Sequence, residues 1–183
     1  MHSDADTVII SDIDAFPLKA EAVARLASDA EAGGICGLAQ VANHKDPKRI
    51  YVGPMFFALK AKVFRSLGSP NLEKWKHGDV GQIITDLAHE KGISVKAIEP
   101  RFAIAPKWNF AGKGVFGVGT FYGELDFFHL FEARKQENLD LLKAVADGTI
   151  AGIHDFEKYI HTAAGGLNLK SNLSRRFKFP LFG

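Results

Sequence analysis

The sequence has very little cysteine and no long apolar run. Cys36 is the only cysteine among 183 residues, so no disulfide can form within the chain, and its apolar neighbours predict a small buried core residue. Residues 1–6 are mostly polar and acidic, unlike a signal peptide. No apolar run reaches the roughly 18 residues that a membrane span requires. We therefore expect a cytoplasmic protein.

The chain also lacks a strong charge of either sign, because its formal net charge is only +2. Its basic residues do not interleave with aromatic residues on a recognisable platform, which argues against nucleic acid as a partner. The C-terminal end is the exception, since no acidic residue follows Glu157 and the segment 174–179 is basic and aromatic. Such a tail could contact the anionic inner surface of a membrane peripherally.

Apolar patterning predicts one domain of the α/β class. We expect strands over 7–11, 35–41, 50–59 and 93–98, with helices that begin at Pro17, span 60–67 and begin at Asp79. This alternation predicts an open mixed, mostly parallel sheet with flanking helices. The hydrophobic content of 46% is enough for one real core.

The second half of the chain has a different pattern. Glycines recur among aromatic residues over 107–123, which predicts a flexible loop able to order over a ligand. They do not follow a strand in the spacing of a dinucleotide fingerprint, so a Rossmann phosphate loop is rejected. Helices are expected over 133–146 and 156–163, separated by a break at Asp147-Gly148.

The most informative stretch is Thr7-Val8-Ile9-Ile10-Ser11, which ends in Asp12-Ile13-Asp14. Side chains alternate along an extended chain, so Asp12 and Asp14 are expected to point the same way. Two hard oxygen donors at the carboxyl end of a strand could share Mg²⁺ or Mn²⁺ with a phosphate oxygen. The alternative is an acidic turn that only caps the next helix.

Four segments in this order resemble nucleotide-sugar glycosyltransferases of the A-type fold. They are the strand ending in Asp12-Ile13-Asp14, the Gly53-Pro54 strand with Phe56-Phe57, His77-Gly78-Asp79 at a helix start, and the segment 128–134. The resemblance implies a partial A-type fold. Its catalytic and acceptor portion would cover residues 1–150, followed by a C-terminal helix and basic tail over 151–183.

The resemblance also implies a metal-dependent enzyme that moves a sugar from a nucleotide-sugar donor to a glycan or another hydroxyl acceptor. Asp12 and Asp14 would hold Mn²⁺ or Mg²⁺ against the diphosphate, His129 would complete the metal or diphosphate site, and Arg134 would add positive charge. Asp79 resembles the general base of inverting members, although an Asp before an apolar helix can equally be an N-cap. The substrate site would include Gly53, Phe56, His77, Gly78 and Trp108.

The two tryptophans and the phenylalanine pair each have a second interpretation. Trp75 and Trp108 lie in predicted loops on the acceptor side, where an aromatic face can stack on a sugar ring or can simply anchor the loop. Phe56 and Phe57 cannot both face one side of a strand, so one of them lines the site or both faces are buried.

The chain departs from the family at its start. Members begin with a β-α-β half that binds the nucleoside, whereas the acidic triplet here arrives at residue 12. We therefore expect a fragment or truncated form. Its sheet edge at 7–11 would be exposed, which favours self-association.

Two other functions remain open. Ile9 to Asp14 also resembles the first motif of haloacid-dehalogenase-like phosphatases, with Asp12 as the nucleophile and Asp14 as the acid-base residue. Ile83 stands where that family has a second acidic residue, and Ala15-Phe16 replaces the usual small residues. The third function is a non-catalytic module that holds a glycan or a partner.

Overall fold

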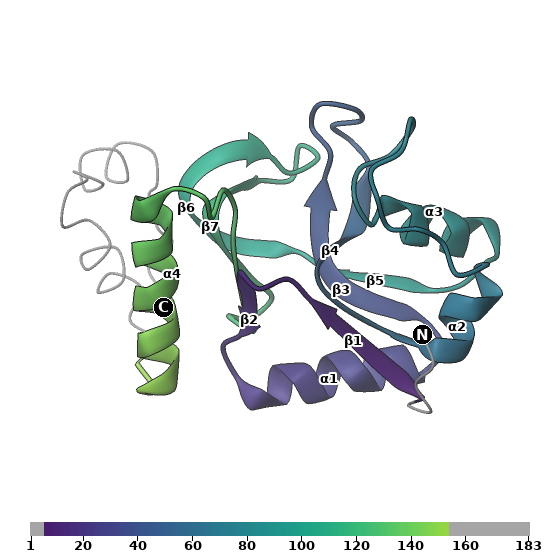
Figure 1. Ribbon diagram of the computed structural model, residues 1–183, viewed down its shortest axis with the longest axis horizontal. Helices are drawn as coiled ribbons and strands as arrows, with labels where there is room; N and C mark the ends of the chain where they lie inside the picture. Colours follow the sequence, from purple (N-terminus) through teal and green to yellow (C-terminus); the bar gives the residue numbers. More distant parts are fainter. Residues whose placement is uncertain (1–5, 154–183) are drawn as a thin grey trace. The chain divides into compact units, whose positions relative to one another are not determined.

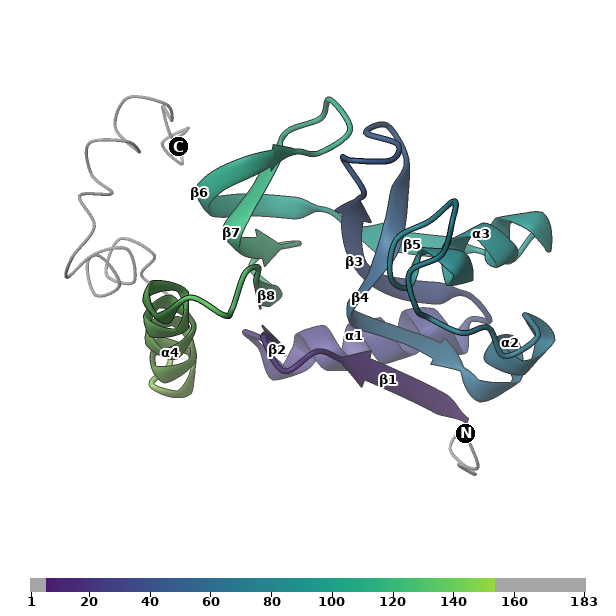
Figure 2. The ribbon, with the colours of Figure 1, turned by 45° about the horizontal axis from the view of Figure 1, so that its top comes forward.

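A computed structural model describes residues 6–153 of the protein (Figures 1 and 2). The chain divides between Leu130 and Phe131 into two compact units. The first unit contains β1 (Thr7–Ser11), β2 (Ala15–Pro17), α1 (Ala20–Glu31), β3 (Ile35–Val41), β4 (Ile50–Lys60), α2 (Ala61–Ser66), α3 (Gln82–Glu90), β5 (Val95–Ile98), β6 (Pro100–Asn109), β7 (Val115–Tyr122) and β8 (Phe127–Leu130). The second unit contains α4 (Gln136–Ile150).

The first unit has two four-stranded sheets whose strand pairs are mostly antiparallel. One sheet has the order β1-β4-β3-β5, and the other has the order β2-β8-β7-β6. Within these sheets only the β3 and β5 pair is parallel. The α/β class is confirmed, whereas the expected mostly parallel sheet is wrong. The connection from β3 to β4 is too short for a crossover helix, so β4 returns antiparallel to β3.

β4 is continuous through Gly53-Pro54 but bulges away from β3. Gly37 pairs with Phe57 and Ala39 pairs with Val52, so the β4 residues 53–56 lie opposite a single residue of β3. The amide of Val52 donates to Thr85 Oγ1 of α3 at 3.0 Å. The bulge is therefore supported by the neighbouring helix, and it shapes the part of β4 that borders the site described below.

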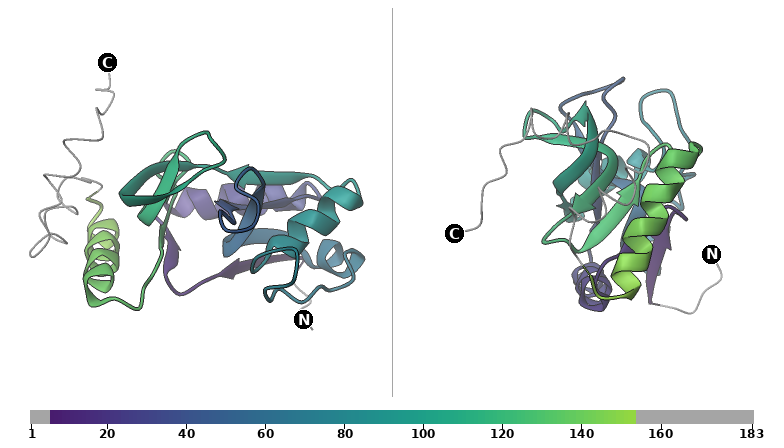
Figure 3. Two further views of the ribbon diagram at one scale, coloured as in Figure 1. Left: turned by 90° about the horizontal axis from the view of Figure 1, so that it is seen from above. Right: turned by 90° about the vertical axis from the view of Figure 1, so that its left-hand side faces the viewer.

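The three helices of the first unit pack against the β1-β4-β3-β5 sheet (Figure 3). α1 contacts β1, β3 and β4, while α2 and α3 contact β4. Cys36 has no exposed surface, which confirms its predicted place in the core. The cluster beneath α2 and α3 consists of Ile35, Val52, Phe57, Leu59, Val63, Leu67, Ile84 and Ala88.

Two expectations for local structure are wrong. Pro17 does not open a helix, because it pairs with Phe127 at the end of β2, and α1 begins only at Ala20. The glycine-rich segment 107–123 is largely not a loop, because most of it lies in the β6 and β7 hairpin. Gly117 allows close approach of the two strands there, since a Cβ would lie 2.5 Å from the carbonyl oxygen of Ala105.

The second unit begins with a turn that leads into α4. Asn138 Nδ2 donates to the carbonyl of Glu132 at 2.8 Å and ties the helix to this turn. α4 continues through Asp147-Gly148 to Ile150, so the expected break there is wrong. The expected helix over 156–163 and the basic segment 174–179 lie outside the described residues. In the described range, none of the helices has the length and apolar character needed to span a membrane.

Candidate functional site

The acidic triplet is the connection between the two sheets. β1 belongs to one sheet and β2 to the other, and Asp12-Ile13-Asp14 lies between them. The amide of Asp12 donates to the carbonyl of Met55 in β4 at 2.9 Å. The hydroxyl of Ser11 lies within hydrogen-bond distance of two carbonyl oxygens, that of Asp12 at 2.9 Å and that of Ala15 at 3.1 Å, and can donate to either of them. The triplet is thus a turn held by hydrogen bonds. The predicted extended strand end, with alternating side chains, is wrong.

His129 lies beside this turn, although it comes much later in the chain. β2 pairs with β8 in a register that places Ala15 opposite His129, and the amide of Leu130 donates to the carbonyl of Asp14 at 2.9 Å. The imidazole Nε2 lies 3.5 Å from Asp14 Oδ1, and His129 is only 4% exposed. The structure therefore brings His129 and Asp14 together, as the resemblance implied.

The ionisation of Asp12 depends on its surroundings and on its charged neighbours. Asp12 is exposed, but the protein atoms on one side of its carboxyl displace water, and this partial desolvation raises the pKa of Asp12. The charge of Asp14 raises that pKa further, while His129 lowers it. A carboxyl whose ionised form is disfavoured in this way gains from a bound cation or from a nearby positive charge.

The donor set suits a cation that is shared with a substrate. Carboxylate oxygens and an imidazole are suitable ligands for Mn²⁺, and carboxylate oxygens suit Mg²⁺. Within residues 6–153 no three His, Cys, Asp or Glu side chains are grouped closely enough to enclose a metal ion. Mg²⁺ commonly binds through one or two carboxylates, with water and substrate phosphates as the other ligands, so Asp12 and Asp14 fit that open type of site.

Asp79 is held in a turn before α3 and is not the N-cap of that helix. The N-cap residue is Gly81, whose φ of 74° is in the left-handed region. The amide of Asp79 donates to Gln82 Oε1 at 3.0 Å, and the amide of Gln82 donates back to the carbonyl of Asp79 at 3.1 Å. Asp79 Oδ1 accepts from the amide of Val80 at 2.9 Å. The N-cap interpretation is wrong, and the carboxylate is fixed without capping the helix.

The Asp79 turn and the acidic triplet border the same part of β4. A Cβ on Gly81 would lie 3.1 Å from Pro54, so this turn packs directly on the bulge. The charge of Asp79 contributes to the raised pKa of Tyr51, whose main cause is burial. Since Asp12 is bonded to Met55, residues 51–55 of β4 carry contacts to both acidic segments.

The other predicted substrate residues have diverse positions. Phe56 is 5% exposed and packs on Phe127 with ring centroids 4.9 Å apart, so it is a packing residue, and Phe57 is also buried. Gly53 lies under the Met55 side chain, which would have to move for a Cβ, since that Cβ would lie 2.3 Å from Met55 Sδ. Trp108 lies on strand β6 and not in a loop, stacked on Phe116 at 5.3 Å.

His77 and Gly78 belong to a short loop with Trp75. Gly78 is buried and is bridged to Trp75, whose ring lies edge-on to His77 with centroids 5.4 Å apart. Arg134 is exposed and lies in the second unit, in the turn before α4. Its predicted role beside the diphosphate stays a prediction.

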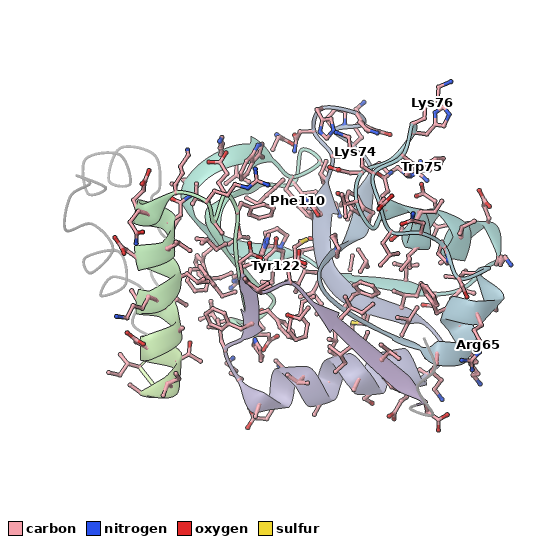
Figure 4. All side chains as sticks on the ribbon, viewed as in Figure 1. Arg65, Lys74, Trp75, Lys76, Phe110 and Tyr122 are labelled. Atoms are coloured by element: carbon pink, nitrogen blue, oxygen red, sulfur yellow. The ribbon has the colours of Figure 1, made fainter. Side chains whose placement is uncertain are left out.

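Two tyrosines near the site were not singled out by the sequence. Tyr51 and Tyr122 are at most 1% exposed, and within residues 6–153 their hydroxyl oxygens have no hydrogen-bond partner. Burial raises the pKa of both, and the charge of Tyr51 contributes to the shift at Tyr122. Figure 4 labels Tyr122. Each lies in an apolar strand pattern, which carries no signal for an isolated buried hydroxyl.

Comparisons of the chain with protein-family models, curated proteins and solved structures gave no match. A functional assignment therefore depends on the chemistry of these residues.

Proposed function

We propose that the protein is a metal-dependent glycosyltransferase that moves a sugar from a nucleotide-sugar donor to an acceptor hydroxyl. The observation that supports this most is the convergence of Asp12, Asp14 and His129 at the junction of the two sheets. The imidazole Nε2 of His129 is 3.5 Å from Asp14 Oδ1. Asp14 raises the pKa of Asp12, and His129 lowers it. This combination of two carboxylates with an imidazole suits a cation and an anionic leaving group.

Asp12 and Asp14 are the residues that would hold Mn²⁺ or Mg²⁺. When bound, the ion would supply positive charge next to the departing diphosphate, which gains negative charge in the transition state. His129 adds to this by presenting its Nε2 from β8, the strand that pairs with β2.

Asp79 would act as the base. As the acceptor oxygen bonds to the anomeric carbon, the bond from that carbon to the phosphate oxygen breaks, and the nucleoside diphosphate leaves with the electron pair. The proton of the acceptor hydroxyl passes to the Asp79 carboxylate. Asp79 Oδ1 is held by the amide of Val80, while Oδ2 has no hydrogen bond among the described residues, so Oδ2 is the atom we assign to this proton.

Two measurements test the proposal on this chain. Isothermal titration should detect Mn²⁺ binding to the wild type, and Asp14→Asn should weaken it by at least about tenfold. Release of nucleoside diphosphate from a panel of sugar nucleotides should require Mn²⁺ or Mg²⁺ and should be lost in Asp14→Asn. Asp79→Asn should retain Mn²⁺ binding and lose turnover. Identical binding heats for the wild type and Asp14→Asn would remove the metal from the proposal.

The same assays separate the two alternative functions. Hydrolysis of p-nitrophenyl phosphate that Asp12→Asn abolishes would favour a phosphatase, because Asp12 would then be the nucleophile. Glycan binding without release of nucleotide from any sugar nucleotide would favour the non-catalytic module.

A further inference from the structure

The loop before Asp79 presents a tryptophan at the surface. Trp75 is 37% exposed, and among the described residues it is the one aromatic side chain in the group of exposed large apolar residues. Figure 4 labels Lys74, Trp75 and Lys76 on this loop, which extends away from α3. An exposed indole with a cation on either side in the sequence is a candidate contact surface.

Trp75 is held in place although its ring is exposed. Its amide donates to the carbonyl of Gly78 at 3.3 Å, and Lys45 Nζ donates to the carbonyls of Trp75 and Gly78 at 2.7 and 2.6 Å. The indole lies against Gly78 so closely that a Cβ there would be 2.0 Å from its Nε1. The rings of Trp75 and His77 meet in a T-shaped arrangement, with an angle of 75° between their planes. An aromatic ring that is fixed before binding loses little conformational freedom when a ligand stacks on it.

The loop is positively charged and leads directly into the candidate base. Lys74 and Lys76 are exposed, and Lys45 places a third ammonium group beneath the loop. Glu73 supplies the one carboxylate of the segment 73–78. Asp79 follows Gly78 and is fixed by Gln82 and Val80. The loop that carries Trp75 is therefore continuous in the chain with the group that would take the acceptor proton, and a ligand with complementary charge is negative.

We propose that Trp75, with Lys74 and Lys76, is the platform for a sugar ring of an acceptor glycan that carries acidic groups. This inference rests on the proposed transferase function and specifies its acceptor class. The apolar face of the sugar would stack on the indole, while its acidic groups would pair with the two lysines.

Tryptophan fluorescence of the wild type tests the platform, and the quenching that Trp75→Phe loses is the part that Trp75 contributes beside Trp108. Tetragalacturonate and mannose 6-phosphate serve as acidic probes, and maltotetraose is the neutral control. We expect saturable quenching by at least one acidic probe and at least about tenfold weaker binding of maltotetraose. Raising the salt concentration should weaken the acidic probe further, because exposed charges are screened.

Calorimetry with the same probe then assigns the residues. Trp75→Ala should weaken binding by about tenfold, and Trp75→Phe should keep part of it. Lys74→Gln with Lys76→Gln should weaken the acidic probe about threefold and leave maltotetraose unchanged. Gly78→Ala displaces the indole without removing it and should weaken binding as well. Val115→Ala removes an exposed apolar side chain of β7 instead and should bind as the wild type does.

The outcomes separate this inference from the transferase assignment. Failure of both acidic probes to bind, or equal affinity in the wild type and Trp75→Ala, overturns the platform whatever the cation does. Mn²⁺ titration of the Trp75 variants should match the wild type, because Asp12 and Asp14 lie on a different turn. If the wild type binds the acidic glycan and does not bind Mn²⁺, the metal-dependent transferase assignment is overturned and the Trp75 platform is retained.

Discussion

The imidazole Nε2 of His129 lies 3.5 Å from Asp14 Oδ1, across the pairing of β2 with β8. The two residues come from opposite ends of the first unit. Their proximity depends on one register, in which Ala15 is opposite His129 and the amide of Leu130 donates to Asp14. The backbone therefore fixes the position of the imidazole relative to the acidic turn, and a cation or anion bound there would meet both side chains.

Replacement of His129 by glutamine is expected to weaken Mn²⁺ binding by about tenfold or more, since the site loses an imidazole and keeps a polar side chain of similar size. Isothermal titration at pH 7 measures the change. Asp79→Asn is the matched control and should leave the affinity unchanged, because Asp79 lies on another turn. Equal affinity in the wild type and His129→Gln would restrict the role of His129 to the diphosphate or to packing.

Tyr51→Phe and Tyr122→Phe are each expected to leave stability unchanged or to raise it by up to about 1 kcal/mol. Both hydroxyls are buried without a partner among residues 6–153, so removing them eliminates a desolvated polar atom. Urea unfolding gives the free energy of unfolding of each variant. Because Thr120 Oγ1 is satisfied by the amide and carbonyl of Gly117, Thr120→Val is the contrast and should cost about 1–3 kcal/mol. A comparable loss in either tyrosine variant would reveal a bonded hydroxyl.

Gly37→Ala is expected to destabilise the first unit by about 1–3 kcal/mol or more, because the β3 and β4 contact leaves no space for a methyl group. The added Cβ would lie 2.4 Å from Phe57 Cβ and 2.7 Å from the carbonyl oxygen of Phe56. Thermal unfolding measures the loss. Gly114→Ala is the control, since a Cβ there has no atom within 4 Å, and it should change stability by less than about 0.5 kcal/mol.

Local sequence patterns predicted the elements whose residues decide their own structure. The runs at Ile35–Val41 and Ile50–Lys60 are strands, and the helix predicted over 60–67 is α2. Cys36 is buried as its neighbours indicated. In these segments the apolar pattern agrees with the packing, so the local sequence alone is sufficient to predict the secondary structure.

The errors occur where a distant partner determines the structure. Pro17 resembles a helix start, yet its place in β2 depends on Phe127, which no local pattern reveals. The glycine-rich segment resembles a loop, yet Phe116 packs on Trp108 and Phe110 from across the hairpin and favours strands. Asp79 has the sequence context of an N-cap, but Gly81 at positive φ starts the helix two residues later.

The structure brings together Asp14 and His129, two of the predicted site residues, through a backbone arrangement that was not predicted. Asp12, Asp14 and His129 were chosen because their motifs resemble a family, and the structure brings the Asp14 and His129 side chains together. Their arrangement by a turn between two sheets follows from the pairing of β2 with β8, which a single sequence does not show. Tyr51 and Tyr122 were not predicted, because no sequence pattern indicates that a buried hydroxyl lacks a hydrogen-bond partner.

Asp12→Asn is expected to stabilise the metal-free protein at neutral pH. Desolvation and the charge of Asp14 raise the pKa of Asp12 above its ordinary value of 3.8, so the ionised carboxylate is less favourable in the folded chain than in the unfolded chain. A carboxyl with a raised pKa contributes full stability below its unfolded pKa and loses that contribution as the pH rises through its folded pKa. The variant should therefore melt higher than the wild type at pH 7, and the difference should shrink as the pH falls toward 4.

Glu31→Gln removes an exposed carboxylate of α1 and should show no such pH-dependent gain. Saturating Mn²⁺ at pH 7 should raise the melting temperature of the wild type and not that of Asp12→Asn, since the ion needs the charged carboxylate. A wild type that melts higher than Asp12→Asn at pH 7 without metal would show that a positive group already compensates Asp12.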